Sequence, residues 1–568
     1  MTLRRRTARF DASGILLWGI PLAFVGFFFF FPLGKILCVA FANEASNILA
    51  SIQASQLLEP LWFTTWQAAL STLLTLIVGL PAAYLFARYE FKGKSFLRLL
   101  TTLPFILPTV VAAAGFNALA GPNGLLNLGL MALFRLTTPP LKLMNTLGGI
   151  LLVHVFYNTT IVIRVVGSAW AQLDPRWENS ARVLGASLRQ TLREVTLPLL
   201  KPSLLAAALL VFLFDFTSFG VILLVGGPHF SSLETAIYQQ VFSMLNLPLA
   251  GLLSILQLFC TFSITVLYNH LNTRRSIPLL PHLSGEGQRA PQRVSEKLFV
   301  SGMNTLLFLL LSLPLVALVV RSFLQLGANR GEFGMVMPAF TLQYYRQLFI
   351  NSNQSIFYVA PAQAALNSLY YAGFTVLFSL LIGLVATYAI TRSPRQANVL
   401  NTLIMLPLGA SAVTLGLGFL VAFNRPPLDP QSFPLLIPIV HTLVAMPFVV
   451  RTVQPVLAGL PENMRHAAAV LGASRWQTWL RVEFPILSRA ALVGAIFSFT
   501  ISLGEFGATT FLARPDRPTL PIAIARYLSM PGDLNYGQAM AMSTLLMLVC
   551  GVAIFLLEKI QLPGEKEI

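Results

Sequence analysis

A series of twelve long apolar stretches constrains this chain more than any other feature of its sequence. A transmembrane helix needs about 20 mainly apolar residues, and each stretch reaches that length. Only 10% of the 568 residues are charged, against about 25% in a typical soluble domain, which excludes a cytosolic enzyme and a disordered protein. We predict an all-α polytopic membrane protein with about 12 transmembrane helices. The predicted spans are residues 14–41, 62–87, 98–120, 147–168, 203–226, 246–270, 298–321, 364–391, 398–423, 434–456, 490–513 and 537–558.

The positions of the positively charged residues predict how these helices are oriented. A net charge of +17 would suit a nucleic-acid-binding protein, but Lys and Arg recur in short blocks between apolar stretches, so we expect no nucleic-acid partner. Blocks of this kind mark cytoplasmic loops, whereas loops 42–61 and 227–245 contain no Lys or Arg. Both termini are therefore predicted to be cytoplasmic. The basic blocks are Arg4–Arg9, Arg88–Arg98, Arg176–Lys201, Arg274–Lys297, Arg392–Arg395 and Arg465–Arg489.

The chain contains an internal repeat, which is a stronger guide to architecture than any single motif. Residues 181–200 and 468–487 are identical at eleven of twenty positions at an offset of 287, where composition predicts about one or two. We therefore predict two homologous six-helix modules, residues 1–271 and 298–568, joined by a cytoplasmic linker, residues 272–297. Modules inserted with the same orientation are related by an axis along the membrane normal, and a substrate path is expected at their interface.

The repeated block lies in a predicted cytoplasmic loop of each module, at residues 178–202 and 465–489. An apolar stripe with basic residues opposite it indicates a short amphipathic element. Gly185 would be a poor choice inside a helix, so we expect it to mark a turn between two short helices. An amphipathic element beside a membrane either lies in the interface or binds a soluble partner. Because the element is duplicated, we favour a pair of partner subunits. The stripe in the first copy consists of Val183, Leu184, Leu188 and Leu192.

The spacing from Gly185 to Pro198, and from Gly472 to Pro485, resembles the EAA loop of ABC-importer permeases, the binding-protein-dependent transport inner-membrane components. That pattern has an acidic-Ala-Ala start, a Gly four positions after the second Ala, and a Leu-Pro before the next span. The resemblance covers essentially the whole chain and implies two fused modules of the type I importer, MetI-like permease fold. Four further stretches resemble the iron(III)/thiamine-type systems: His154–Asn158, Thr235–Gln239, Leu503–Gly507 and Thr519–Ile524.

The resemblance implies a multi-pass protein of the bacterial inner membrane with three partners besides lipid: two ABC ATPase subunits and an extracytoplasmic substrate-binding protein. The chain departs from the family pattern at the acidic position, where Asn179 and His466 stand. No phosphate-binding G-x-x-x-x-G-K-[ST] loop occurs, so we expect no enzyme activity and no cofactor here, with ATP bound and hydrolysed by the partners. The residues expected to couple to the ATPases are Asn179, Ala181, Gly185, Pro198, His466, Ala468, Gly472 and Pro485.

Two carboxylates lie within predicted spans, where a charge is a functional hypothesis by default. Asp215 is expected midway along the fifth span and Glu505 within the eleventh, one helical turn apart in the aligned modules. They would give a cation-favouring lining to the translocation path, or else a helix–helix hydrogen bond. His154 and His441 align at the offset of 287, and we expect them to make structural hydrogen bonds rather than a metal site.

Two other classes of function, a secondary transporter and a membrane-embedded enzyme, are compatible with a chain of many transmembrane helices. A secondary transporter with two six-span repeats would fit the composition, but an ion-coupled carrier needs no duplicated docking element. A membrane-embedded enzyme would need a catalytic cluster, and none is visible in the sequence. If the chain is an importer permease, we expect its substrate to be iron(III) or thiamine. Another small solute, such as a polyamine, is the alternative.

Overall fold

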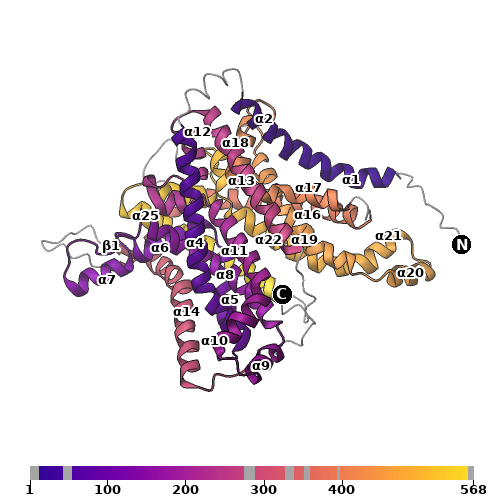
Figure 1. Cartoon of the computed structure of the whole chain (residues 1–568). Helices are drawn as coiled ribbons and strands as arrows, with labels where there is room; N and C mark the ends of the chain where they lie inside the picture. The colour runs from indigo at the N-terminus through magenta and orange to yellow at the C-terminus, as the bar shows by residue number, and fades with distance from the viewer. Residues whose placement is uncertain are drawn as a thin grey trace. The chain divides into compact units, whose positions relative to one another are not determined.

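The structure is a computed structural model that describes residues 12–41, 54–273, 288–326, 338–350, 359–392, 397–430 and 432–560. The N-terminal block Arg4–Arg9 and most of the predicted linker, residues 274–287, lie outside the described residues. The described part is mainly helical and contains one short antiparallel pair of strands, β1 (Leu324–Leu326) and β2 (Pro338–Phe340), in which Leu324 pairs with Phe340 (Figure 1).

The predicted spans are confirmed in number and, apart from the fifth and eleventh, in approximate position. Among the described residues, ten helices are long and apolar enough to cross a membrane, and twelve spans result if each of two bent pairs counts as one. The bent pairs are the predicted third and ninth spans, Lys94–Pro104 with Thr109–Phe134, bent by 110°, and Ala397–Gly409 with Ala412–Ala422, bent by 95°. The ninth bends because the Ser411 hydroxyl accepts the Thr414 N–H at 3.0 Å and starts a new helix.

The fifth and eleventh spans begin and end earlier than predicted. Their helices run over Arg189–Phe216 and Trp476–Gly504, whereas hydropathy placed them at residues 203–226 and 490–513. Each starts in the repeated loop and runs through a π-helical turn, η2 (Leu192–Thr196) or η6 (Trp479–Glu483), directly before the turn that contains Pro198 or Pro485, a residue that has no N–H to donate. The prediction that Asp215 lies midway along the fifth span is therefore wrong, as is the prediction that Glu505 lies within the eleventh. Asp215 is the penultimate residue of its helix, and Glu505 follows directly after the last residue of the other.

The chain divides into two compact units whose boundaries differ from those of the predicted modules. Unit 1 comprises Met1–Val39, Ala365–Thr519 and Phe555–Ile560, and unit 2 comprises the remainder. The core of unit 2 forms where α4 (Ala54–Arg88), α8 (Leu147–Ala171) and α11 (Leu197–Phe216) pack together. Its other helices include α5 (Lys94–Ile106), α6 (Thr109–Ala120), α7 (Leu125–Phe134), α12 (Leu233–Phe242), α13 (Leu247–Thr273), α14 (Val294–Ser322), α15 (Gln343–Arg346), α24 (Leu520–Ser529) and most of α25 (Asp533–Ile560).

Unit 1 repeats the same core with equivalent positions. Val162, Val166 and Leu200 in unit 2 correspond at an offset of 287 to Val449, Val453 and Leu487, and all six side chains are buried in their cores. The predicted repeat is thus present in the packing as well as in the sequence. The helices of unit 1 are α1 (Ala12–Val25), most of α2 (Phe31–Ala40) and of α16 (Pro361–Arg392), α17 (Ala397–Gly409), α18 (Ala412–Ala422), α19 (Leu436–Ala458), α20 (Glu462–Val470), α21 (Arg475–Thr478), α22 (Phe484–Gly504) and α23 (Gly507–Leu512).

The first helix of each module packs with helices of the other module. In unit 2, α14 from the second half of the sequence lies against α6, where a Cβ added at Gly115 would be 2.9 Å from the Pro314 carbonyl oxygen. In unit 1, the start of α2 approaches α18 in the same way, since a Cβ at Gly418 would be 3.1 Å from Pro32 Cβ. The two crossings explain why the compact units do not follow the linker.

Candidate functional site: two repeated segments and two buried histidine clusters

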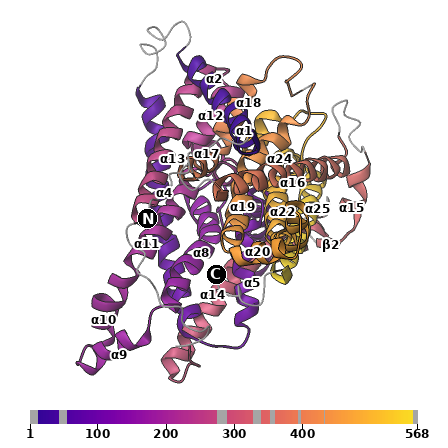
Figure 2. The same ribbon diagram turned by 90° about the vertical axis from the view of Figure 1, so that its right-hand side faces the viewer.

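The first repeated segment is a helix–turn–helix. It lies at the end of unit 2 that is opposite to α12 (Figures 1 and 2). Its loop helix α9 (Pro175–Val183) begins at Asp174, whose carboxylate accepts the Arg176 N–H at 2.8 Å. The helix ends at Gly185, where φ is +91° and Ala186 N–H donates to the Ala181 carbonyl at 3.0 Å. A residue with positive φ after a helix closes the last carbonyls in this way, and glycine is the usual choice. The predicted turn at Gly185 is confirmed.

The second repeated segment has the same local structure. Its loop helix α20 ends at Gly472, where φ is +78° and Ala473 N–H donates to the Ala468 carbonyl at 3.0 Å. The next helix starts with a reciprocal cap, in which Ser474 N–H donates to Gln477 Oε1 at 2.8 Å and Gln477 N–H to Ser474 Oγ at 3.2 Å. The matching pair in the first copy, Ser187 and Gln190, makes the same two hydrogen bonds at 2.9 and 3.3 Å.

The turn presents two apolar residues to the surroundings in each copy. Val183 and Leu184 are 87% and 88% exposed, and Val470 and Leu471 are each 86% exposed. The amphipathic stripe does not continue along one helix face, because the turn at Gly185 separates these residues from the helices α10 (Leu188–Thr191) and η2 (Leu192–Thr196) that follow.

The other residues expected to couple to partners are placed on both sides of each loop helix. Asn179 and His466, which stand at the acidic position of the family pattern, are exposed, while Ala181 is half-buried and Ala468 is buried. Pro198 and Pro485 are exposed in the first turn of α11 and α22.

A buried histidine organises the polar side chains in the core of unit 2. His154 Nδ1 lies 2.8 Å from Gln67 Nε2 on α4 and 3.4 Å from Asp215 Oδ1 on α11, while Nε2 lies 2.8 Å from Ser218 Oγ. Asn158, one turn along α8, donates its amide to Asp215 Oδ1 at 2.6 Å. The Asp215 side chain is fully buried, so it is joined to helices of its own unit.

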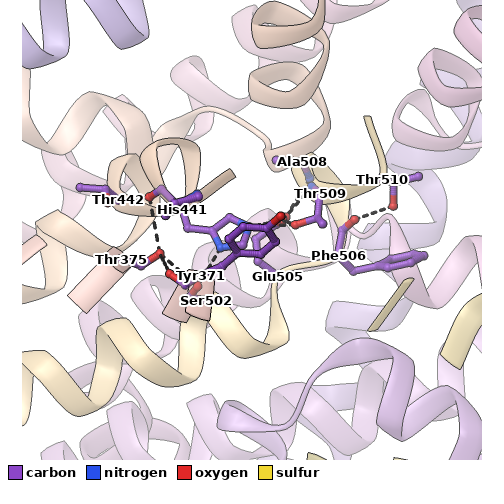
Figure 3. Close-up of polar contacts among 11 residues, drawn as sticks. Tyr371, Thr375, His441, Thr442, Ser502, Glu505, Phe506, Ala508, Thr509 and Thr510 are labelled. Atoms are coloured by element: carbon purple, nitrogen blue, oxygen red, sulfur yellow. Dashed lines mark hydrogen bonds and ion pairs between the residues drawn. The ribbon is translucent and has the colours of Figure 1, made fainter. Parts of the chain in front are cut away.

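Unit 1 contains the equivalent cluster around His441 (Figure 3). The imidazole lies between Ser502, whose Oγ is 2.8 Å from Nδ1, and the pair Thr509 and Glu505, whose oxygens are 2.8 and 3.2 Å from Nε2. The Glu505 carboxylate also accepts the N–H groups of Ala508 and Thr509 at 2.8 and 2.9 Å. It therefore satisfies backbone donors where the helix is interrupted.

Where one cluster has a carboxylate, the other has a serine hydroxyl at the aligned position. Asp215 aligns with Ser502 and Ser218 aligns with Glu505 at the offset of 287, so each histidine contacts one carboxylate and one serine in opposite order. The expected histidine hydrogen bonds are confirmed, but their partners were missed. The aligned histidines and the carboxylates one turn apart were the signal that could have found them. Among the described residues, no three His, Cys, Asp or Glu side chains gather in a group suited to a metal ion.

Comparison with known proteins shows that both halves of the chain match one protein family. Residues 76–277 and 379–566 each match the family described as "Binding-protein-dependent transport system inner membrane component". The chain is 27% identical over 492 residues to the "Thiamine transport system permease protein ThiP" of Brucella abortus (strain 2308), covering 86% of this chain and 85% of that protein. It is 27% identical over 522 residues to the ThiP of Escherichia coli (strain K12), covering 90% of each. It is also 27% identical over 521 residues to the "Probable ABC transporter permease protein y4fN" of Sinorhizobium fredii (strain NBRC 101917 / NGR234), covering 89% of this chain and 88% of that protein.

Proposed function

Since this chain belongs to the binding-protein-dependent transport system inner-membrane components, we propose that its two repeated segments each bind one ATPase subunit of an ABC importer. The chain is the multi-pass permease of such an importer in the inner membrane, and its family works with a substrate-binding protein and ATPase partners. The two modules supply two equivalent loop helices, so one ATPase for each is the stoichiometry that we propose. The segments would then face the cytoplasm, in agreement with the basic residues around them.

The exposed Val-Leu pair on each repeated segment carries this proposal. Leu184 and Leu471 lie outside the spans and are almost completely exposed, although burying such a side chain stabilises a protein by about 1.5–3 kcal/mol. An apolar tip on a rigid turn, present twice at equivalent positions, suits insertion into a groove on a partner.

Co-purification tests the docking site directly. Leu184→Asp and Leu471→Asp each place a charge at the centre of the proposed contact, and the double variant should no longer retain the ATPase. Leu245→Asp is the matched control, because Leu245 is 79% exposed on the loop between α12 and α13, and it should retain the ATPase fully. Full retention by the double variant would contradict the proposal.

We propose thiamine, a small organic cation, as the substrate. The relatives named thiamine transport system permeases align over most of this chain and over most of their own length. Uptake of labelled thiamine by vesicles that contain the permease, its ATPase and the binding protein should be reduced by unlabelled thiamine and not by iron(III) or spermidine. Competition by iron(III) or spermidine instead would assign the importer to that solute.

The hypothesis that Asp215 and Glu505 line the translocation path stays a prediction. Both side chains bond to a histidine of their own unit in this structure, which supports a role in holding the helices. Asp215→Asn and Glu505→Gln should be assayed for uptake under conditions where the binding protein still stimulates ATP hydrolysis. Unchanged uptake in both variants would contradict the path hypothesis.

A further inference from the structure

The loop helix of the first repeated segment is joined to its unit by an ion pair. Glu178 Oε1 on α9 lies 2.8 Å from Arg88 Nη2 at the end of α4, and the same oxygen accepts the Thr196 hydroxyl at 2.9 Å. The Arg88 side chain is only 9% exposed. Because α9 buries none of its residues, apolar packing does little to hold it, and these polar contacts fix its position.

The second loop helix is also joined to its unit by an ion pair, but here the loop helix supplies the arginine and not the carboxylate. Glu483, at the end of η6 (Trp479–Glu483), is buried and accepts Arg465 Nε of α20 at 2.7 Å. The other Glu483 oxygen accepts the Tyr388 hydroxyl of α16 at 2.9 Å, and Trp479 Nε1 donates to the same hydroxyl oxygen at 2.8 Å.

The loop-helix members of the two ion pairs, Glu178 and Arg465, stand at the same position of the repeat with opposite charge. At the offset of 287, Glu178 aligns with Arg465 and Thr196 aligns with Glu483. The carboxylate is therefore on the loop helix in one half and on the following helix in the other. In both halves an Arg–Glu ion pair holds the loop helix, although the Arg and the Glu stand at different repeat positions in the two halves. The recurrence of this contact indicates that the loop helix must be held.

The contact reaches the same long helix in both halves. Arg88 belongs to α4, which also carries Gln67 of the His154 cluster, 21 residues away, or about 30 Å along a helix. Tyr388 belongs to α16, which also carries Thr375, whose hydroxyl lies 3.1 Å from Ser502 Oγ in the His441 cluster. A displacement of either loop helix can thus be carried along one helix to a buried histidine cluster.

We propose that Arg88–Glu178 and Arg465–Glu483 are positioning pairs that transmit the movement of an ATPase from each loop helix to α4 and α16. This proposal rests on the proposed function of the loop helices as ATPase-binding elements. It assigns a role to Glu178, which faces the permease itself, distinct from that of the exposed tip at Leu184. Loss of a positioning pair should leave the ATPase bound but reduce its coupling to transport.

Charge reversal in the first half tests the proposal in the assembled transporter. Glu178→Arg places a second guanidinium beside Arg88, and we expect stimulation of ATP hydrolysis by the loaded binding protein to fall by about tenfold while the ATPase still co-purifies. Arg88→Glu/Glu178→Arg restores the pair with its charges exchanged, and Glu178→Arg/Thr196→Glu copies the arrangement of the second half. Both should recover coupling. Glu194→Arg is the matched control, since Glu194 is exposed on the neighbouring turn, and it should behave as the native chain.

The outcomes separate the positioning pair from the docking site. Native coupling in Glu178→Arg, or failure of both double variants to restore it in protein that purifies and melts like the native chain, would overturn the positioning role. Loss of ATPase co-purification in Glu178→Arg would also overturn it, because Glu178 would then be part of the docking contact. If the native chain binds no ATPase at all, the proposed function fails instead.

Discussion

Two equivalent glycines lie at a close helix crossing in each unit, and replacing them tests the packing of both cores. A Cβ added at Gly79 of α4 would lie 2.6 Å from Val162 Cβ of α8, and one at Gly383 of α16 would lie 2.8 Å from Val449 Cγ1 of α19. Since carbon atoms pack at about 3.5–4.0 Å, the helices would have to separate by roughly 1 Å. Overpacking of this kind costs about 1–3 kcal/mol, so Gly79→Ala and Gly383→Ala should each lower the melting temperature of the purified protein.

The matched control and two compensating changes make this prediction specific. A Cβ at Gly373, also on α16, meets no atom within 4 Å, so Gly373→Ala should keep or raise the melting temperature through helix propensity. Val449→Ala removes the nearest atom to the new Cβ at Gly383 and should restore part of the loss. Val162→Ala should not rescue Gly79→Ala, because the clash there is with Val162 Cβ itself. Melting of both glycine variants at or above the Gly373→Ala value would refute the packing argument.

Two further predictions concern buried charges. Glu505→Gln replaces the carboxylate beside His441 and turns an amide N–H₂ toward groups that donate hydrogen bonds, so it should destabilise the chain by about 1–3 kcal/mol; an unchanged melting curve would contradict the role of Glu505 in holding the helix break. Asp533→Asn takes the carboxylate 3.9 Å away from the buried Arg321 guanidinium, which keeps its hydrogen bond to the Leu324 carbonyl, and should cost about 1–3 kcal/mol. Asp516→Asn, at an exposed ion pair, should change stability by less than about 1 kcal/mol, and equal effects of the two Asp variants would refute the argument.

The number of spans and the repeat could be predicted because both depend on local composition. Long apolar runs must become helices in a bilayer, where unsatisfied backbone groups are too costly, and the eleven identities at one offset needed no structure. The boundaries of the fifth and eleventh spans could not be predicted from hydropathy. Those helices begin in polar segments at Arg189 and Trp476, and they end within the apolar run because buried side chains such as Glu505 satisfy the freed backbone groups.

The candidate site could be predicted only where one residue determines the local geometry. Gly185 and Gly472 adopt positive φ, which few other residues tolerate, so their turns were visible in the sequence. The partners of Asp215 and Glu178 were not, because His154 and Arg88 are distant in the chain and lie on helices whose facing sides depend on the packing of the whole unit.

The exchanged pairs have a common physical explanation. A carboxylate removed from water is costly unless a partner meets it, so a half that kept a buried carboxylate but lost its partner would be destabilised. The partner can, however, change position if the new site lies within reach of the same group. Asp215 and Ser218 are three residues apart, and both reach the ring of His154. Glu178 and Thr196, the two positions that carry a carboxylate in one half or the other, are joined by a hydrogen bond in the first half. A comparison of aligned positions finds these residues different, whereas a comparison of contacts finds one histidine–carboxylate contact and one arginine–glutamate pair in each half. Functional residues in such a repeat are therefore better sought by comparing the side-chain contacts of the two halves than by comparing aligned residues. Comparison of contacts identifies Arg465–Glu483 as the counterpart of Arg88–Glu178, in addition to the aligned glycines and prolines.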